Sequence, residues 1–320
     1  MRKFSNAAVC ALVVSMAMAV AGCGQINGLK AKMAFREANG LYQSGDYRQA
    51  LAAYEESIEL DPSLTDAYFY LANSADNIYR AVRRGEPEND ALLTTAVENY
   101  EKASELATQP NIRKLALEYL VSAYNSPDKM NDPGMAEPLV LRMIEMNPEE
   151  MENYFAAAGI YEDFGEYESA EEMFLKAQEM QPDQPTVYMQ LAGYYNRAGE
   201  FEKTIEALQQ RAAIEPNNPE VYYTIATYYW DKAYRDFRIQ AAAKQALVQT
   251  GVDMIDKAIS IKDDYDEALV YKGLLLRLQA NLETDRPKQL ALLKEADDLR
   301  DRAEELRKIK SAGGAPAAGE

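Results

Sequence analysis

The sequence has no histidine, and its only cysteines are Cys10 and Cys23. The absence of histidine excludes Ser-His-Asp and Cys-His catalysis, histidine-based zinc sites and most proton shuttling near neutral pH. If Cys10 lies in a segment that is removed, a single cysteine remains and no disulfide can form within the chain. We therefore expect a fold that packing alone stabilises.

Positive charge is also scarce. Lysine and arginine number 34 against 52 aspartates and glutamates, a formal net charge of −18. Such a surface repels phosphate backbones, so nucleic acid is not an expected partner. The length of 320 residues and the hydrophobic content of 48% are sufficient for a buried core, in two average domains or in one elongated array.

A short positive start precedes a long apolar run at the N-terminus. Arg2 and Lys3 are followed by residues 7–20 (AAVCALVVSMAMAV), whose length is typical of the hydrophobic region of a signal peptide. A transmembrane helix is the competing interpretation, because the next charge is Lys30 and about 20 apolar residues suffice to span a membrane. Glycines and polar residues from Gly22 onward shorten the strongly apolar part, which favours the signal peptide.

The end of this run, residues 20–23 (VAGC), resembles the lipobox of bacterial lipoproteins, in which a branched aliphatic residue and two small residues precede an invariant cysteine. The resemblance implies cleavage after Gly22, loss of residues 1–22 and a diacylglyceryl group on the Cys23 thiol. Two or three acyl chains anchor a protein stably, whereas one binds reversibly. We expect a mature protein that is tethered to a membrane through residues 23–30 and does not span it.

The lipobox also implies a location in the bacterial cell envelope. In diderm bacteria an aspartate after the lipidated cysteine often retains a lipoprotein at the inner membrane, and this position is Gly24 here. The resemblance therefore favours an outer-membrane anchor that faces the periplasm. The inner membrane and the cell surface stay open as alternatives.

Beyond the N-terminus, the sequence repeats itself every 34 residues. Prolines, tyrosines and alanines recur at this interval: Pro148, Pro182 and Pro216; Tyr154, Tyr188 and Tyr222; Ala158, Ala192 and Ala226. The unit at residues 154–182 has two apolar helical faces separated by a turn. Gly165 suits the left-handed position that ends the first helix, and Pro182 cannot continue the second. Each unit is a helix-turn-helix that buries its apolar face only against the next unit.

These residues resemble the tetratricopeptide repeat, which places small and aromatic residues in its first helix and alanine, an aromatic residue, alanine and a final proline in its second. The first unit shows this at residues 45–62 (GDYRQALAAYEESIELDP). The fifth unit has Thr204, Leu208 and Arg211 at the packing positions of its second helix, which predicts a weaker helix. The resemblance covers residues 31–309 and implies an all-α, right-handed superhelical solenoid of about seven units.

Several segments depart from the regular unit. Tyrosine-to-alanine spacings that are about a dozen residues too long predict extended hairpins at about residues 65–108 and 219–263. Leucines and alanines at alternating steps of four and three predict an amphipathic capping helix at about 287–309. The composition of the tail, residues 310–320, is typical of disorder.

The candidate binding surface follows the first helices of the units, which line the concave face in the tetratricopeptide family. An aromatic or large apolar side chain recurs there, and an amide or a small residue follows four positions later. Apolar surfaces give affinity and amides bond an extended backbone, so this pattern suits a bound peptide. The groove candidates are Phe35, Asn39, Phe69, Asn73, Phe155, Met189, Tyr223 and Trp230. The competing interpretation is that the apolar members pack against neighbouring helices, and that Trp230 is a core residue of the second extended hairpin.

Some family members hold a C-terminal carboxylate with lysine, asparagine and arginine on successive first helices. The matching positions here are Phe35 and Asn39, followed by Asp66 and Tyr70. The cationic residues of this clamp are missing, so the sequence does not predict a receptor for chaperone tails.

Arg80, Arg83 and Arg84 form the main basic cluster away from the termini. They either dock an acidic partner or a lipid headgroup, or stabilise the C-terminal end of a helix through its dipole. The second interpretation needs no ligand and is the simpler one.

Catalysis could rest only on carboxylate, tyrosine, serine or lysine side chains. Glu162 and Glu166 are one helical turn apart, but Gly165 places them at a turn, and acidic pairs are usually solvated surface. No glycine-rich phosphate loop or recognisable metal cluster occurs, so we predict no cofactor and no enzyme. We expect a scaffold or adaptor that binds protein or peptide partners in envelope assembly or secretion. A carboxylate-dependent envelope hydrolase and a self-associating structural protein are the alternatives.

Overall fold

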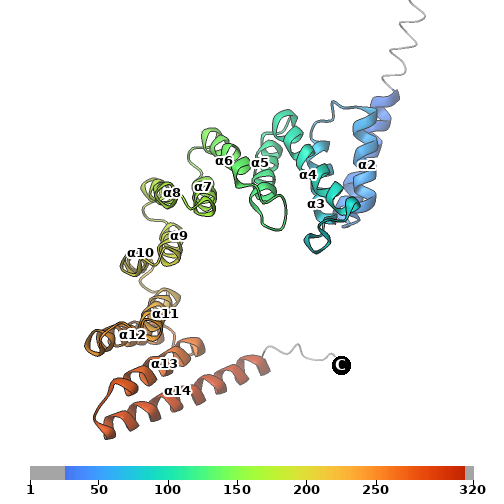
Figure 1. Ribbon diagram of the computed structural model, residues 1–320. Coiled ribbons are helices and arrows are strands. Elements are labelled where there is room, and N and C mark those ends of the chain that lie inside the picture. Colours follow the sequence, from blue (N-terminus) through green and yellow to red (C-terminus); the bar gives the residue numbers. More distant parts are fainter. Residues whose placement is uncertain (1–25, 314–320) are drawn as a thin grey trace, which may run out of the picture. The chain divides into compact units, whose positions relative to one another are not determined.

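The computed structural model describes residues 26–313, and all regular secondary structure in this range is helical (Figure 1). This confirms the predicted all-α class. Residues up to Met173 belong to one compact unit and residues from Phe174 onward to a second. The predicted signal peptide and Cys23 lie outside the described residues.

The first unit is a succession of helices in which α2 to α7 each pack on the next. A first helix at residues 26–43 precedes them. The others are α2 (Tyr47–Leu60), α3 (Ala67–Ile78), a short 3-10 helix η1 (Ala81–Arg83), α4 (Pro87–Leu106), α5 (Pro110–Asn125), α6 (Pro133–Met146) and α7 (Met151–Phe164). Helix α8 (Tyr167–Met180) contains the boundary between the two units.

Local chemistry sets where these helices begin and end. Pro87, Pro110 and Pro133 stand in the first turns of α4, α5 and α6, where the N–H that proline lacks would have no helical partner. Gly165 ends α7 with a φ of +76°, in the left-handed region that glycine adopts without strain. The sequence predicted this turn, and the structure confirms it.

The core of the first repeat combines alanine with buried tyrosine. Ala38, Ala50 and Ala67 are fully buried and let three successive helices approach closely. Tyr54 fills the space between them, and its hydroxyl donates a hydrogen bond of 2.7 Å to Oδ1 of Asn39. A buried tyrosine needs such a partner for its polar end. The alternation of small and aromatic residues in the sequence therefore becomes close helix packing.

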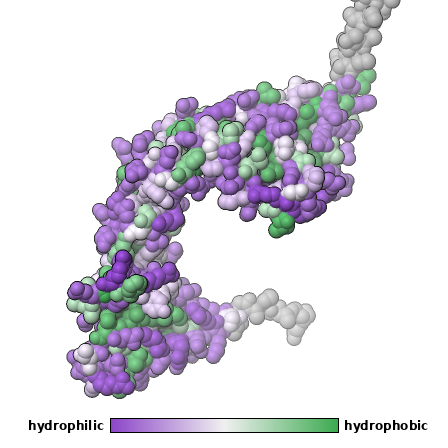
Figure 2. Space-filling view, in the orientation of Figure 1, coloured by the Kyte–Doolittle hydropathy of each residue, from purple (hydrophilic) through white to green (hydrophobic). Residues whose placement is uncertain are grey.

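The second unit contains two long hairpins after one repeat of ordinary length. Its helices are α9 (Pro185–Arg197), α10 (Phe201–Ile214), α11 (Pro219–Arg235), α12 (Ala241–Ile261), α13 (Asp266–Leu282) and α14 (Arg286–Gly313). Figure 2 shows hydrophobic side chains gathered around α12 and α13 within a mainly hydrophilic surface. A core around Ile255 and Leu275 connects α11 to α14. At Gly273, an added Cβ would lie 3.2 Å from the Ala296 carbonyl oxygen, so α13 and α14 approach closely there.

Helix α14 covers α13 and is fastened at its far end by a buried carboxylate. Asp266 accepts hydrogen bonds from Arg307 at 2.7 Å and from Lys310 at 2.6 Å. These bonds lower the pKa of Asp266 to about 2. The helix continues to Gly313, four residues past the expected end at 309, so residues 310–313 belong to the helix and not to the tail.

The residues at the unusual packing positions of α10 are buried nonetheless. Thr204 is fully buried, and its hydroxyl donates to the Glu200 carbonyl oxygen at 3.0 Å. Arg211 is also buried and pairs with Glu215 at 2.8 Å. The polar groups that depart from the repeat pattern are thus satisfied locally, and α10 is as long as α2. Among the helices that the structure describes, none combines the length and apolar character needed to cross a membrane.

Candidate functional site

A pocket of about 420 Å³ lies in the first unit. It is formed by the first helix, the turn between α2 and α3, the start of α3 and the turn between α4 and α5. The lining residues are Phe35, Asn39, Tyr42, Gln43, Ser63, Leu64, Thr65, Asp66, Ala67, Tyr70, Thr108 and Gln109. Its volume falls within the range of sites that hold small ligands or single side chains. The structure therefore brings Phe35 and Asn39 of the predicted groove together at one concave site.

Aromatic rings form one wall of this pocket. The ring centroids of Tyr42 and Tyr70 are 5.6 Å apart in an edge-to-face arrangement, and those of Phe35 and Tyr70 are 6.3 Å apart. Tyr54 stacks on Tyr70 at 5.8 Å with an interplanar angle of 18°. Such contacts fix the ring positions. The wall is therefore preformed.

Polar groups lie beside these rings. Asn39 accepts the hydroxyl of Tyr54 on its carbonyl oxygen, and its NH₂ group has no partner within the range that the structure describes. The Thr65 hydroxyl oxygen is shielded from solvent and has no hydrogen-bond partner among the described residues. Both residues line the pocket. A buried polar atom without a partner, such as the Thr65 hydroxyl oxygen, is uncommon. The half-buried Asn39 NH₂ group is free to donate to a bound ligand.

Asp66 gives the pocket its charge. Its carboxylate accepts hydrogen bonds from the Thr108 backbone N–H at 2.9 Å and from Gln109 Nε2 at 2.8 Å. Partial burial opposes ionisation, but the hydrogen bonds from Gln109 and Thr108 outweigh it and lower the pKa of Asp66. Asp66 is therefore ionised at neutral pH.

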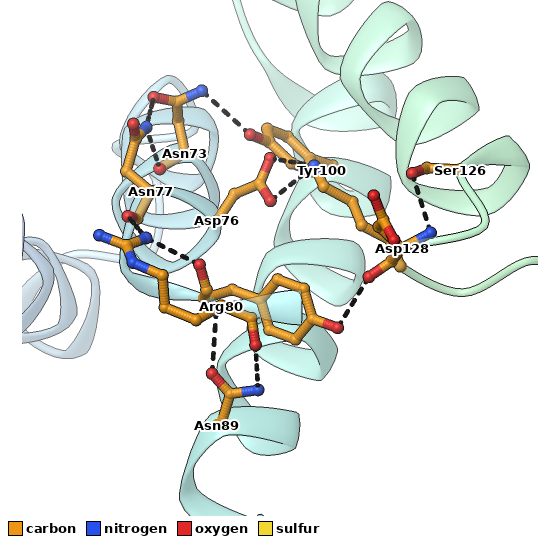
Figure 3. A network of polar contacts seen from close by, with 10 residues as sticks. Asn73, Asp76, Asn77, Arg80, Asn89, Tyr100, Ser126 and Asp128 are labelled. Carbon is orange, nitrogen blue, oxygen red and sulfur yellow. Dashed lines mark hydrogen bonds and ion pairs between the residues drawn. The ribbon is translucent and has the colours of Figure 1, made fainter. Parts of the chain in front are cut away.

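Phe69 and Asn73 lie behind the pocket, and the structure corrects their place in the predicted groove. Asn73 is buried and accepts the Tyr42 hydroxyl at 2.6 Å. It donates to the Tyr100 hydroxyl at 3.0 Å (Figure 3). Phe69 is buried against Tyr100 and Tyr119. Both residues belong to the internal core, because the amide oxygen and nitrogen of Asn73 each already have a hydrogen-bond partner and the ring of Phe69 is covered.

The same network extends to the first extended hairpin (Figure 3). Lys129, from the turn between α5 and α6, pairs with Asp76 of α3 at 2.7 Å. The Tyr79 hydroxyl donates to the Asp128 carbonyl oxygen at 2.9 Å. These groups border a second recess of about 330 Å³. Burial, and then the charge of Asp76, raises the pKa of Tyr100, which remains a neutral phenol.

The three arginines of the basic cluster form hydrogen bonds and an ion pair in and beside the same hairpin. Arg80 donates to the carbonyl oxygens of Asn77 at 2.6 Å and Tyr79 at 2.8 Å, at the C-terminal end of α3. Arg84 donates to backbone carbonyls of the turn between α5 and α6, and Arg83 pairs with Glu86 at 2.5 Å. The interpretation that needs no ligand explains these arginines, because each holds nearby backbone or an adjacent carboxylate.

The remaining groove candidates lie elsewhere. Phe155 is half-buried in α7, and Met189 is exposed in α9. Tyr223 and Trp230 both lie on α11 and both contact Tyr271 of α13, with centroids 5.3 and 5.8 Å apart. These two residues form a separate aromatic row within the second unit.

The acidic pair does not form a distinct site. Glu162 lies in the last turn of α7, and Glu166 follows the left-handed Gly165. Glu166 accepts the hydroxyl of Ser169 at 3.3 Å, which places its carboxylate at the start of α8. No group of three or more potential metal ligands occurs among the residues that the structure describes.

Sequence reasoning missed the part of the pocket that the next hairpin supplies. Thr108 and Gln109 are more than 40 residues from Asp66 in the chain, as the separations of their hydrogen bonds show. The signal that could have found the site was Asp66 itself, the one charged residue among Phe35, Asn39, Asp66 and Tyr70.

Comparison with known families identifies the repeat. Residues 38–74 match the family described as TPR repeat, and residues 152–184 match the one described as Tetratricopeptide repeat. The chain contains tetratricopeptide repeats. The first match includes most of the pocket lining, from Asn39 to Tyr70. No curated protein matches the sequence.

One solved structure supports the same fold, and a second is similar in part. The C-terminal part of a TPR repeat-containing protein from Cytophaga hutchinsonii is 15% identical, with a TM-score of 0.59, and the match covers 85% of this chain and 98% of that one. A tetratricopeptide repeat protein from Parabacteroides merdae is also 15% identical, with a TM-score of 0.49 and coverage of 88% and 99%. The TPR repeats support a protein-interaction scaffold.

Proposed function

We propose that this protein is a lipid-anchored TPR scaffold of the bacterial envelope, which faces the periplasm and binds a protein or peptide partner in assembly or secretion. The observation that carries the binding role is the pocket of the first repeat. There, Phe35 and Asn39 of one helix face the same recess as Tyr70 of the next repeat. The recess offers apolar rings beside polar groups that have no partner, which is the chemistry that an extended peptide requires.

Site-specific photo-crosslinking in cells tests this role. The full chain carries the photoreactive residue at Gln43, which is exposed and lines the pocket. Glu37, exposed on the same helix and outside the lining, is the matched control position. We expect one predominant crosslinked partner at position 43 that is absent at position 37 and that Phe35→Ala diminishes. The same products at both positions would refute the binding role of the pocket.

The anchor rests on the resemblance of residues 20–23 to a lipobox. Mass spectrometry of the mature N-terminus tests it. We expect a chain that begins at an acylated Cys23 and sediments with outer membranes, and Cys23→Ser should abolish acylation. An uncleaved chain, or an unmodified Cys23, would contradict the anchor while the binding role could still hold.

A further inference from the structure

The pocket of the first repeat has one charged wall and no counter-charge. Asp66 is the only charged side chain among the twelve residues that line it. No lysine or arginine of the described chain forms an ion pair with Asp66; its hydrogen-bond partners, Thr108 and Gln109, are neutral. Neutral donors stabilise a carboxylate but leave its charge in place. The pocket therefore presents a carboxylate whose charge no lysine or arginine of the described chain neutralises.

The aromatic wall favours the same sign of ligand. A cation within about 6 Å of a ring face is attracted by the electrons of that face. Phe35, Tyr42 and Tyr70 all line the pocket, and burial raises the pKa of Tyr42, which keeps its phenol neutral. A carboxylate and aromatic rings that line the same pocket form an environment that suits an ammonium or guanidinium group.

The charge of the pocket also disfavours a ligand of the opposite kind. Asp66, which lines the pocket with Phe35 and Asn39, would repel a C-terminal carboxylate. The formal charge of −18 over the whole chain adds a long-range attraction for basic segments.

We infer that this pocket is a clamp of reversed charge, which takes the lysine or arginine side chain of a peptide partner between Asp66 and the aromatic wall. This assignment deepens the proposed scaffold role and rests on it. The NH₂ group of Asn39 would donate to a backbone carbonyl of the same peptide, because peptide backbones present acceptors next to each side chain.

Saturation-transfer NMR, which detects weak binding, tests the inference with the full chain in detergent. The probes are pentapeptides with blocked ends, alanine throughout except for a central lysine, arginine, glutamine, norleucine or glutamate. We expect lysine and arginine peptides to bind about tenfold more tightly than the glutamine and norleucine peptides, with the glutamate peptide weakest. Equal binding of lysine, norleucine and glutamine peptides would overturn the inference without any variant being needed.

Two variants of lining residues and one control variant locate the binding. Asp66→Asn should reduce binding of the lysine peptide to the level of the glutamine peptide. Asp61→Asn makes the same change of charge in the same turn, outside the pocket lining, and should leave the preference intact. Phe35→Leu should weaken the lysine peptide several-fold by removing the ring. If the crosslink at Gln43 is specific but the lysine preference is absent, or if Asp66→Asn and Asp61→Asn behave alike, the charge assignment fails and the scaffold role stands.

Discussion

The hydroxyl of Tyr42 donates a hydrogen bond of 2.6 Å to the side-chain oxygen of Asn73. This contact joins the first helix of one repeat to the first helix of the next. Asn73 in turn donates to Tyr100 of α4, so a single buried amide connects three helices. An amide in this position stabilises the register between repeats and is not free to bind a ligand.

Asn73→Ala should therefore lower the stability of the first unit and leave the pocket rings in place. The variant leaves the buried Tyr100 hydroxyl and the half-buried Tyr42 hydroxyl without this partner, which predicts a loss of about 2 kcal/mol in the free energy of unfolding. Urea unfolding followed by circular dichroism measures it. Asn77→Ala, at an exposed position on the same helix, removes one hydrogen bond to Asn73 and leaves Tyr42 and Tyr100 paired, so it should have a smaller effect. If stability is unchanged and a crosslinked partner is lost, Asn73 is a binding residue and not a packing residue.

Asn39 and Asn73 show what the sequence can and cannot predict. Both occupy the same position of the repeat, and the periodicity treats them alike. Asn73 has a helix on either side, whereas no described helix precedes the one that carries Asn39, which stays half-buried at the pocket. The repeat pattern predicts the helices and their small and aromatic contacts, but the exposure of a position depends on its neighbours in space.

The extended hairpins illustrate the same limit. Spacing alone predicted the insert between α3 and α4, but not that Tyr79 and Arg84 bond to the turn between α5 and α6. Those partners are more than 40 residues away. Long-range polar pairs have no periodic signal, so only the structure could identify them.

The ion pairs between Asp266 and helix α14 predict that the stability of the protein depends on pH. The pKa of Asp266 is about 2 in the folded protein and about 3.9 in an unfolded chain, so its contribution is present above pH 4 and is lost as the pH falls towards 2. We expect about 1 kcal/mol, because Arg307 and Lys310 are partly exposed and water screens the pairs.

Unfolding of wild type and Asp266→Asn between pH 6 and pH 2 measures this contribution. The difference between the two proteins should shrink over the acid end of that range. Asp264→Asn, at an exposed position in the same turn, should follow the wild type throughout. A difference that stays constant with pH would show that the carboxylate charge does not fasten α14.

The distance to the neighbouring helix predicts that a larger side chain is destabilising at Gly273 and tolerated at Gly159. Gly273→Val should lower the free energy of unfolding by about 1–3 kcal/mol, because its side chain would meet the backbone of α14 at Ala296. Gly159→Val in α7 has open space around its Cβ and should change stability by only a few tenths of a kcal/mol. Thermal unfolding compares the pair. Equal effects would contradict the close approach of α13 and α14.

Trp230 is the single tryptophan, so its fluorescence reports on the aromatic row of the second unit. Trp230 stacks on the exposed ring of Tyr234 with centroids 4.9 Å apart and an interplanar angle of 8°, and it packs edge-on against Tyr271. Tyr234→Ala uncovers one face of the indole and should shift its fluorescence to longer wavelength. Phe237→Ala, which removes a ring that is 88% exposed in the following turn, is the control and should leave the emission unchanged.

Trp230→Ala then separates a packing role from a binding role. Because the indole is half-buried against α13, we expect a loss of about 2 kcal/mol in the free energy of unfolding, below the 3–5 kcal/mol typical of a fully buried tryptophan. Crosslinking at Gln43 in the first unit should be unaffected, since that pocket has its own aromatic wall. If stability is unchanged and a crosslink placed at the exposed Tyr234 is lost, Trp230 is a binding anchor and the second unit carries a partner site of its own.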